Sequence, residues 1–172
     1  MNKALLDTDT LSEIGKGKNP AIAANAKTYR KAFGYYSFST VTVLEIVRGY
    51  QKTQQLQRLH AFMASIASEE VFPLDVAAAE LAGRITGDLD RIGQPISRAD
   101  PMIAAIAIDQ GLELVTGNTA HYQRIHQLGY PLTLAWMPMQ KKTRMANLTG
   151  ESQESTNFYG KRSHLLAVCA TK

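Results

Sequence analysis

Residues 100–118 read DPMIAAIAIDQGLELVTGN, and this stretch decides the fold class. Residues 100–110 indicate a helix, which Gly111 ends. The run LELVT at residues 112–116 is short and apolar, as a buried strand is. A helix that leads directly into a buried strand is typical of parallel α/β proteins, in which helices connect the strands of one sheet.

The same alternation of short apolar runs and helical patterns continues along most of the chain. Strands are predicted at residues 4–6, 35–39, 71–74, 112–116 and 132–135. Helices are predicted at residues 20–33, 76–92, 100–110 and 119–128, with two more between residues 41 and 68, and GKGK at 15–18 indicates a turn. In the 41–68 region an apolar helical face is predicted for Leu44, Val47, Leu56, Leu59, Phe62, Met63 and Ile66. We therefore predict a three-layer α/β domain, a central parallel β-sheet flanked by helices.

The composition is that of an ordinary folded protein. The chain of 172 residues fits one domain, and 45% hydrophobic with 20% charged residues excludes a disordered chain or a fibre. No apolar stretch approaches the ~20 residues of a membrane span, and the opening MNKALLD lacks a signal-peptide core, so a cytoplasmic protein is expected. The single cysteine, Cys169, excludes a disulfide within one chain.

The net charge of +4 is concentrated at one end of the sequence. Residues 1–140 contain 13 basic and 13 acidic side chains and are therefore neutral. Residues 141–172 hold 6 basic residues against 2 acidic ones and lack sustained apolar periodicity. We expect a folded domain at residues 1–140, followed by a polar, basic and mobile C-terminal extension at residues 141–172.

Four polar residues stand at predicted strand ends or helix starts. They are Asp7 after the first strand, Glu45 early in the helix after residues 35–39, Asp100 at a helix start, and Asn118 after residues 112–116. In open parallel sheets such positions converge at one edge, where ligands bind. Oxygen ligands of this kind suit Mg²⁺ or Mn²⁺, and such a metal centre suits cleavage of phosphodiester bonds.

Helix capping offers a competing explanation for each residue by itself. Asp100 precedes a proline, as N-cap residues often do, and Asn118 and Asp7 are also N-cap candidates. Thr42 and Glu45 have the spacing of a capping box. Capping does not predict that all four fall at one edge of the sheet while the other acids fall elsewhere, so the four together favour a site.

Four segments of the sequence resemble the PIN-domain ribonucleases, and in particular the virulence-associated protein C toxins. They are LLDTDTLSE at residues 5–13, STVTVLEIVRGY at 39–50, ISRADPMIAAIA at 96–107 and LELVTGNTAHYQRI at 112–125. Their agreement in order and spacing makes the resemblance specific, and it extends over nearly the whole of residues 1–140.

The resemblance implies a parallel central sheet and Mg²⁺- or Mn²⁺-dependent cleavage of RNA by the toxin of a toxin-antitoxin pair. It implies that Asp7, Asp100 and Glu45 bind the metal. It implies that Asn118 occupies a fourth catalytic position, which is aspartate in many members. A cognate antitoxin protein and a homodimer of the toxin are implied as well, whereas residues 141–172 have no counterpart.

The expected mechanism follows from the chemistry of bound metal ions. An ion lowers the pKa of a bound water and neutralises charge on the scissile phosphate, so in-line attack would leave a 5′-phosphate and a 3′-hydroxyl. Thr8 and Thr116 are predicted to hydrogen-bond the carboxylates or the substrate, and Arg98 to contact RNA phosphate or form a surface salt bridge. His121 and His126 do not share a helix face well, so neither is predicted to bind metal.

Two other functions fit part of the sequence. Asp7 and Asp9 after an apolar strand resemble the first motif of haloacid-dehalogenase-type phosphatases, but neither lysine nor acid follows between residues 116 and 140. A catalytically silent PIN-like module that binds RNA or protein is favoured by Asn118 and by the neutral body, which lacks a basic face for RNA. Metal-dependent cleavage distinguishes the nuclease from this module.

Overall fold

The computed structural model describes residues 2–135, so the predicted domain end at residue 140 and the extension at 141–172 lie outside the described residues. In chain order the elements are β1 (Ala4–Leu6), α1 (Thr8–Lys16), α2 (Pro20–Phe33), β2 (Ser37–Ser39), α3 (Thr40–Lys52), α4 (Leu56–Ser65), the 3-10 helix η1 (Ile66–Ser68), β3 (Glu70–Phe72), α5 (Val76–Arg91), α6 (Ala99–Asp109), β4 (Glu113–Val115), α7 (Thr119–Gln127) and β5 (Leu134–Ala135). No helix in this part of the chain combines the length and the apolar character of a membrane span.

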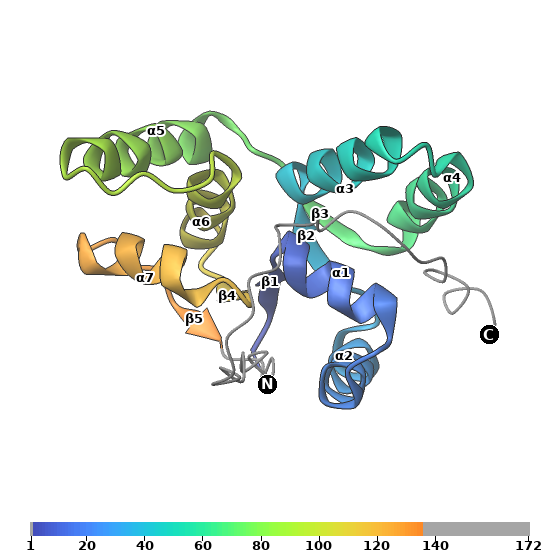
Figure 1. The fold of residues 1–172 in the computed structure, drawn as a ribbon. Helices are drawn as coiled ribbons and strands as arrows, with labels where there is room; N and C mark the ends of the chain where they lie inside the picture. The colour runs from blue at the N-terminus through green and yellow to red at the C-terminus, as the bar shows by residue number, and fades with distance from the viewer. Residues whose placement is uncertain (1, 136–172) are drawn as a thin grey trace, which may run out of the picture.

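All paired strands run parallel (Figure 1). β4 lies between β1 and β5, with Leu114 opposite Leu5 on one side and opposite Leu134 on the other. β2 pairs with β3 in a second ladder and lies beside β1, which gives the spatial order β3-β2-β1-β4-β5. The predicted central parallel sheet is confirmed, but its hydrogen-bonded ladder is interrupted between β1 and β2.

Helices cover both faces of the sheet because alternate strand residues point in opposite directions. Leu5 of β1 and Leu114 of β4 pack in the main core with α5, α6 and α7. Ala4, Leu6 and Val115 pack on the other face against side chains of α1 and α2. The predicted three layers are therefore present.

Small side chains bring α6 close to its neighbours. Most of this helix is buried, and its central residues Ala104, Ala105 and Ala107 have no exposed surface. α6 packs extensively against α5, where Ala78 and Ala82 are also buried. Alanines let helix backbones approach closely, and this packing fixes the N-terminal end of α6 at the carboxyl edge of the sheet.

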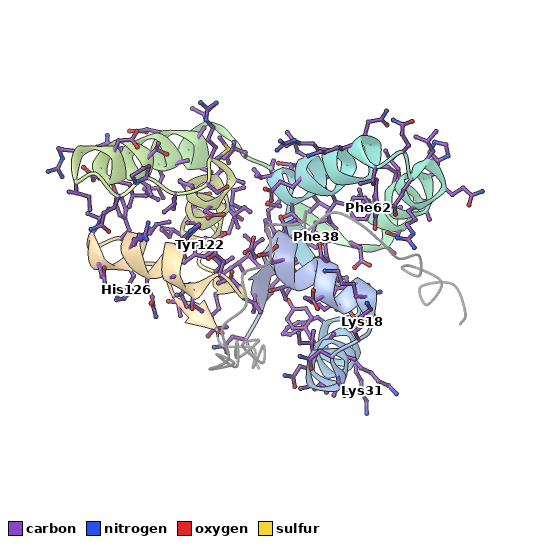
Figure 2. The ribbon with its side chains drawn as sticks, in the orientation of Figure 1. Lys18, Lys31, Phe38, Phe62, Tyr122 and His126 are labelled. Atoms are coloured by element: carbon purple, nitrogen blue, oxygen red, sulfur yellow. The ribbon has the colours of Figure 1, made fainter. Side chains whose placement is uncertain are left out.

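Three local predictions are wrong. Residues 8–16 form α1, which was not predicted, and the chain turns only at Gly17, the αL residue that ends this helix. β2 begins at Ser37 rather than at residue 35. The predicted apolar face of α3 and α4 is only partly covered: Phe62 packs on Phe38 of β2 with ring centroids 6.4 Å apart (Figure 2), but Leu44 remains 62% exposed. These two helices pack against each other, and α3 contacts β2 (Figure 1).

Candidate active site

Asp7 ends β1 at the carboxyl edge of the sheet and is almost completely buried. Its backbone N–H donates to the carbonyl of Val115 on β4 at 3.0 Å, which holds the strand end in place. Its Oδ1 accepts from the backbone N–H of Thr8 at 2.7 Å, so Asp7 caps α1 as the sequence suggested. Its Oδ2 accepts from the hydroxyl of Thr116 at 2.7 Å. Asp7 therefore has a capping role and a place in the site at the same time.

Asp100 lies in the first turn of α6 and faces the start of α7. Its Oδ2 is 2.6 Å from Nδ1 of His121 and 3.4 Å from Nδ2 of Asn118, and those two nitrogens are 2.8 Å apart. The backbone N–H of Asn118 donates to Oγ1 of Thr116 at 2.9 Å. A chain of contacts thus runs from Asp7 through Thr116 and Asn118 to Asp100, and it joins β1, β4, α6 and α7.

Glu45 of α3 reaches the same edge of the sheet through Thr8. The Thr8 hydroxyl donates to Oε2 of Glu45 at 2.5 Å. α3 begins at Thr40, and the hydroxyl of its N-cap residue, Ser39, accepts from the backbone N–H of Thr42. The predicted capping box is therefore wrong, because Glu45 lies beyond the first turn and its carboxylate bonds to Thr8.

Capping also fails to explain Asp100 and Asn118. Arg98 is the N-cap residue of α6, and Asp100 lies inside the helix with Pro101 after it. Asn118 does occupy the N-cap position of α7, but its side chain makes no capping hydrogen bond. The Asn118 amide instead points toward Asp100 and His121.

Burial raises the pKa of both aspartates. Loss of water raises the pKa of Asp7 to about 6, although hydrogen bonds from Thr116 and Thr8 lower it. Burial also raises the pKa of Asp100, against the lowering effect of His121, and the charge of Asp9 raises both pKa values. Among residues 2–135 no lysine or arginine forms an ion pair with Asp7 or Asp100. Two buried carboxylates without a lysine or arginine partner are an arrangement that a bound cation stabilises.

The three predicted substrate contacts occupy different surroundings. Thr116 is buried and holds the Asp7 carboxylate, and half-buried Thr8 holds Glu45, so both are placed to orient carboxylates. Arg98 is exposed two residues before Asp100, and within residues 2–135 no hydrogen bond or ion pair holds its side chain. Its predicted contact with RNA phosphate stays a prediction.

The sequence pattern of the PIN domain matches residues 4–126 of this chain. The chain belongs to the PIN-domain family. It is 32% identical over 126 residues to the tRNA(fMet)-specific endonuclease VapC of Shigella flexneri and 34% identical over 128 residues to that of Salmonella typhimurium; each alignment covers 73% of this chain and 93% of the relative. Among solved structures, DNA-bound VapBC from Salmonella typhimurium superposes with a TM-score of 0.64 at 29% identity, covering 78% of this chain and 98% of that one.

Membership of the PIN-domain family confirms the predicted resemblance and the three-layer α/β fold. The same match overturns the alternative of a haloacid-dehalogenase-type phosphatase. In this PIN domain Asp9, which that alternative needs as a second catalytic acid, is exposed on α1.

The donors of this PIN domain fit a hard divalent cation. Within residues 2–135 no three His, Cys, Asp or Glu side chains come close enough together to enclose an ion. Mg²⁺ does not need such a cage, since it usually binds one or two carboxylates and keeps several waters or takes oxygens from substrate phosphates. Asp7 and Asp100 meet that requirement, with Glu45 linked to Asp7 through Thr8.

Sequence reasoning assigned no catalytic role to two residues at this edge of the PIN domain. His121 contacts Asp100 directly, and the spacing to Asn118 gave a signal, because residues three apart lie on one helix face. Tyr122 is fully buried, and its hydroxyl interacts with the charges of Asp7 and Asp100. Nothing in the sequence distinguishes Tyr122 from an ordinary core aromatic residue.

Proposed function

We propose that this protein is a divalent-metal-dependent endoribonuclease and the toxin of a toxin-antitoxin pair. The observation that carries this proposal is the pair of buried carboxylates, Asp7 and Asp100, at the carboxyl edge of the sheet, with no lysine or arginine partner among the described residues. Support for the reaction comes from the relatives named as tRNA(fMet)-specific endonucleases, which this chain matches over 93% of their length. Support for a partner comes from the similar VapBC structure, in which we take the second component to be the cognate antitoxin.

Each site residue has a proposed role. Asp7, Asp100 and Glu45 bind Mg²⁺ or Mn²⁺, and Asn118 occupies a fourth catalytic position. When bound, the ion lowers the pKa of a water and stabilises the negative charge that builds up on the phosphate. Thr116 and Thr8 hold the carboxylates of Asp7 and Glu45 in place.

RNA is the proposed substrate, and the printed name of the two relatives makes tRNA(fMet) the first RNA to test. Exposed Arg98, two residues from Asp100, is proposed to contact an RNA phosphate. We also propose a cytoplasmic homodimer, with a nuclease domain at residues 1–140 and a C-terminal extension at residues 141–172.

Cleavage assays on the full-length, antitoxin-free protein test the proposal. The protein is incubated with tRNA(fMet) and with total RNA in Mg²⁺ or Mn²⁺, beside an EDTA control. Cleavage is expected to need metal and to leave 5′-phosphate and 3′-hydroxyl ends. Asp7→Asn and Asp100→Asn should abolish it, whereas Asp109→Asn, an exposed aspartate at the far end of α6, should cleave like the wild type. Cleavage that continues in EDTA, or in both site variants, contradicts the proposal.

The alternative of a catalytically silent module predicts no RNA cleavage in the same assay. A folded, metal-loaded wild type that cleaves none of these RNAs but still binds RNA or an antitoxin would support the silent module. The variant Asn118→Asp then distinguishes two explanations. Cleavage by this variant would mean that asparagine at residue 118 weakens the site, and continued inactivity would support the silent module.

A further inference from the structure

We infer that His121 is a nitrogen ligand of the cation at this site, and that it makes the site prefer Mn²⁺ over Mg²⁺. This inference deepens the proposed function and rests on it. A site of carboxylate and amide oxygens alone would not discriminate strongly between these two ions, since both are suited to oxygen ligands. An imidazole nitrogen ligand favours Mn²⁺ over Mg²⁺.

The contacts around Asp100 cannot all be hydrogen bonds. Oδ2 of Asp100, Nδ1 of His121 and Nδ2 of Asn118 form a triangle with sides of 2.6, 2.8 and 3.4 Å. If His121 carries its proton on Nδ1 and donates to ionised Asp100, the Asn118 amide hydrogens face another donor. If Nδ1 is unprotonated, it accepts from Asn118 but presents a lone pair to the carboxylate of Asp100. With Asp100 ionised, at most two of the three contacts are favourable.

A cation among the three groups would be bound by all of them. Turning the Asn118 amide by half a rotation exchanges Nδ2 for Oδ1, so each group then presents a lone pair: a carboxylate oxygen, an amide oxygen and an imidazole nitrogen. These side chains come from α6, from the loop before α7 and from the first turn of α7. No single helix supplies the set, which is why the spacing of His121 and His126 in the sequence did not predict it.

A second and independent observation points to a ligand at the same place. Tyr122 has no exposed surface, and its hydroxyl is the only buried side-chain polar atom within residues 2–135 without a hydrogen-bond partner. The carboxylate of Asp7 lies near this hydroxyl, but the two groups do not have the geometry of a hydrogen bond. A buried hydroxyl without a hydrogen-bond partner destabilises the fold. A water bound to the cation would give it that partner.

His121 is positioned to accept an ion from solvent. Its side chain is 34% exposed, whereas Asp100 beside it is 11% exposed. Its backbone N–H donates to the carbonyl of Asn118 at 3.2 Å, which fixes the first turn of α7. On the same helix, Tyr122 faces α6 and His126 lies on the outer side (Figure 2). His121 is therefore partly exposed to solvent while it contacts the buried carboxylate of Asp100.

The ligand type determines the metal preference. Mg²⁺ binds oxygen almost exclusively and gives up its waters reluctantly, whereas imidazole suits first-row transition dications. For any nitrogen-containing site the affinity rises from Mn²⁺ to Co²⁺. We therefore expect Mn²⁺ to bind more tightly than Mg²⁺, and Co²⁺ more tightly than Mn²⁺.

Metal binding is measured on the untagged, full-length protein so that no added histidines compete. Mn²⁺ is titrated by the loss of the EPR signal of the free ion, and Mg²⁺ by its competition with Mn²⁺. His121→Gln is expected to weaken Mn²⁺ by about tenfold or more and Mg²⁺ much less, so the preference for Mn²⁺ collapses. His126→Gln, an exposed histidine of the same helix, is the matched control and should leave both affinities unchanged.

Electron spin-echo modulation of bound Mn²⁺ detects the nitrogen itself. The wild type and His126→Gln should show coupling to an imidazole ¹⁴N, and His121→Gln should not. His121→Asp keeps a metal-binding side chain, so metal binding by this variant shows that it is folded. It should bind Mn²⁺ without the nitrogen coupling, and it should bind Mg²⁺ more tightly than the wild type. Absence of ¹⁴N coupling in the wild type, or an unchanged preference for Mn²⁺ in both His121 variants, overturns the inference.

The two proposals fail in different ways. Loss of the His121 inference leaves an oxygen-ligated site whose Mg²⁺-dependent cleavage still requires Asp7 and Asp100. Loss of the proposed function appears as RNA cleavage that ignores EDTA, or as a metal-loaded protein that cleaves no RNA. Metal titration and cleavage assays on the same variants therefore report on the two separately.

Discussion

Replacing Asp7 by asparagine should stabilise the metal-free protein at neutral pH while it abolishes RNA cleavage. Asp7 is 4% exposed, and burial raises its pKa from 3.8 to about 6. The folded state therefore binds this proton more tightly than the unfolded state does. Folding stability falls as the pH rises from about 4 to about 6, and the full penalty is present above pH 6.

The size of the penalty follows from that difference in pKa. Each pKa difference of one corresponds to about 1.4 kcal/mol, so an ionised Asp7 costs the folded state about 3 kcal/mol. Asparagine removes the charge, but its single oxygen cannot accept from both Thr8 and Thr116. Losing one of these hydrogen bonds costs about 1 kcal/mol. We expect a net gain of about 2 kcal/mol above pH 7 and a loss of about 1 kcal/mol near pH 4.

Urea unfolding in EDTA, followed by circular dichroism at pH 4.5, 6 and 8, measures this difference. Asp109→Asn serves as the control, since its side chain is exposed and should show no such pH dependence. Adding Mn²⁺ at about 100 times its Kd should then stabilise the wild type by about 2.7 kcal/mol and Asp7→Asn by far less. If Asp7→Asn is less stable than the wild type at pH 8, or if the difference does not change with pH, the reasoning about a desolvated carboxylate is refuted.

Three further substitutions, one of them with a matched control, test the surrounding structure. Thr116→Val removes the donor to Asp7 and the acceptor of the Asn118 N–H, so it should destabilise the fold by about 1–3 kcal/mol and weaken Mn²⁺ about 10- to 100-fold; unchanged Mn²⁺ affinity would argue against an orienting role. Glu45→Gln should change the free energy of unfolding by less than about 1 kcal/mol, because glutamine still accepts from Thr8, yet it should slow RNA cleavage at least about tenfold; cleavage at the wild-type rate would remove Glu45 from the site. Leu89→Ala should cost about 2–5 kcal/mol in urea unfolding, since Leu89 is 1% exposed. Ile92→Ala, which alters a 41% exposed residue at the end of the same helix, should cost less than about 1 kcal/mol, and equal costs would contradict the assignment of the core.

The sequence predicted the types and order of most elements because buried strands and amphipathic helices carry strong periodic signals. It missed α1, whose apolar side chains Leu11 and Ile14 give too short a repeat, and whose last turn contains Gly15. The sequence also did not predict that the hydrogen-bonded ladder is interrupted between β1 and β2. No residue pattern in these two three-residue strands indicates this interruption.

The site was predictable where it depends on topology. Asp7 and Asn118 directly follow strands, and the rule that parallel strand ends share an edge brings them together. The contacts of Thr8 with Glu45 and of Thr116 with Asp7 agree with the predicted orienting role of both threonines. His121 and Tyr122 were not predictable from this rule, because their place depends on how α7 lies against α6.

In the sequence these acids fit both a helix cap and a functional site, whereas in the structure their contacts differ. A carboxylate at a helix start satisfies backbone N–H groups, so any acid there fits the capping pattern. Two of these acids do not cap a helix: Ser39, not Thr42, is the N-cap of the helix that carries Glu45, and Asp100 lies inside α6 rather than at its N-cap. Both carboxylates therefore have oxygens that the helices do not use, and both turn toward the edge where Asp7 lies. Asp7 combines a capping role with a place at this edge, whereas Glu45, Asp100 and His121 make contacts there that no capping rule predicts.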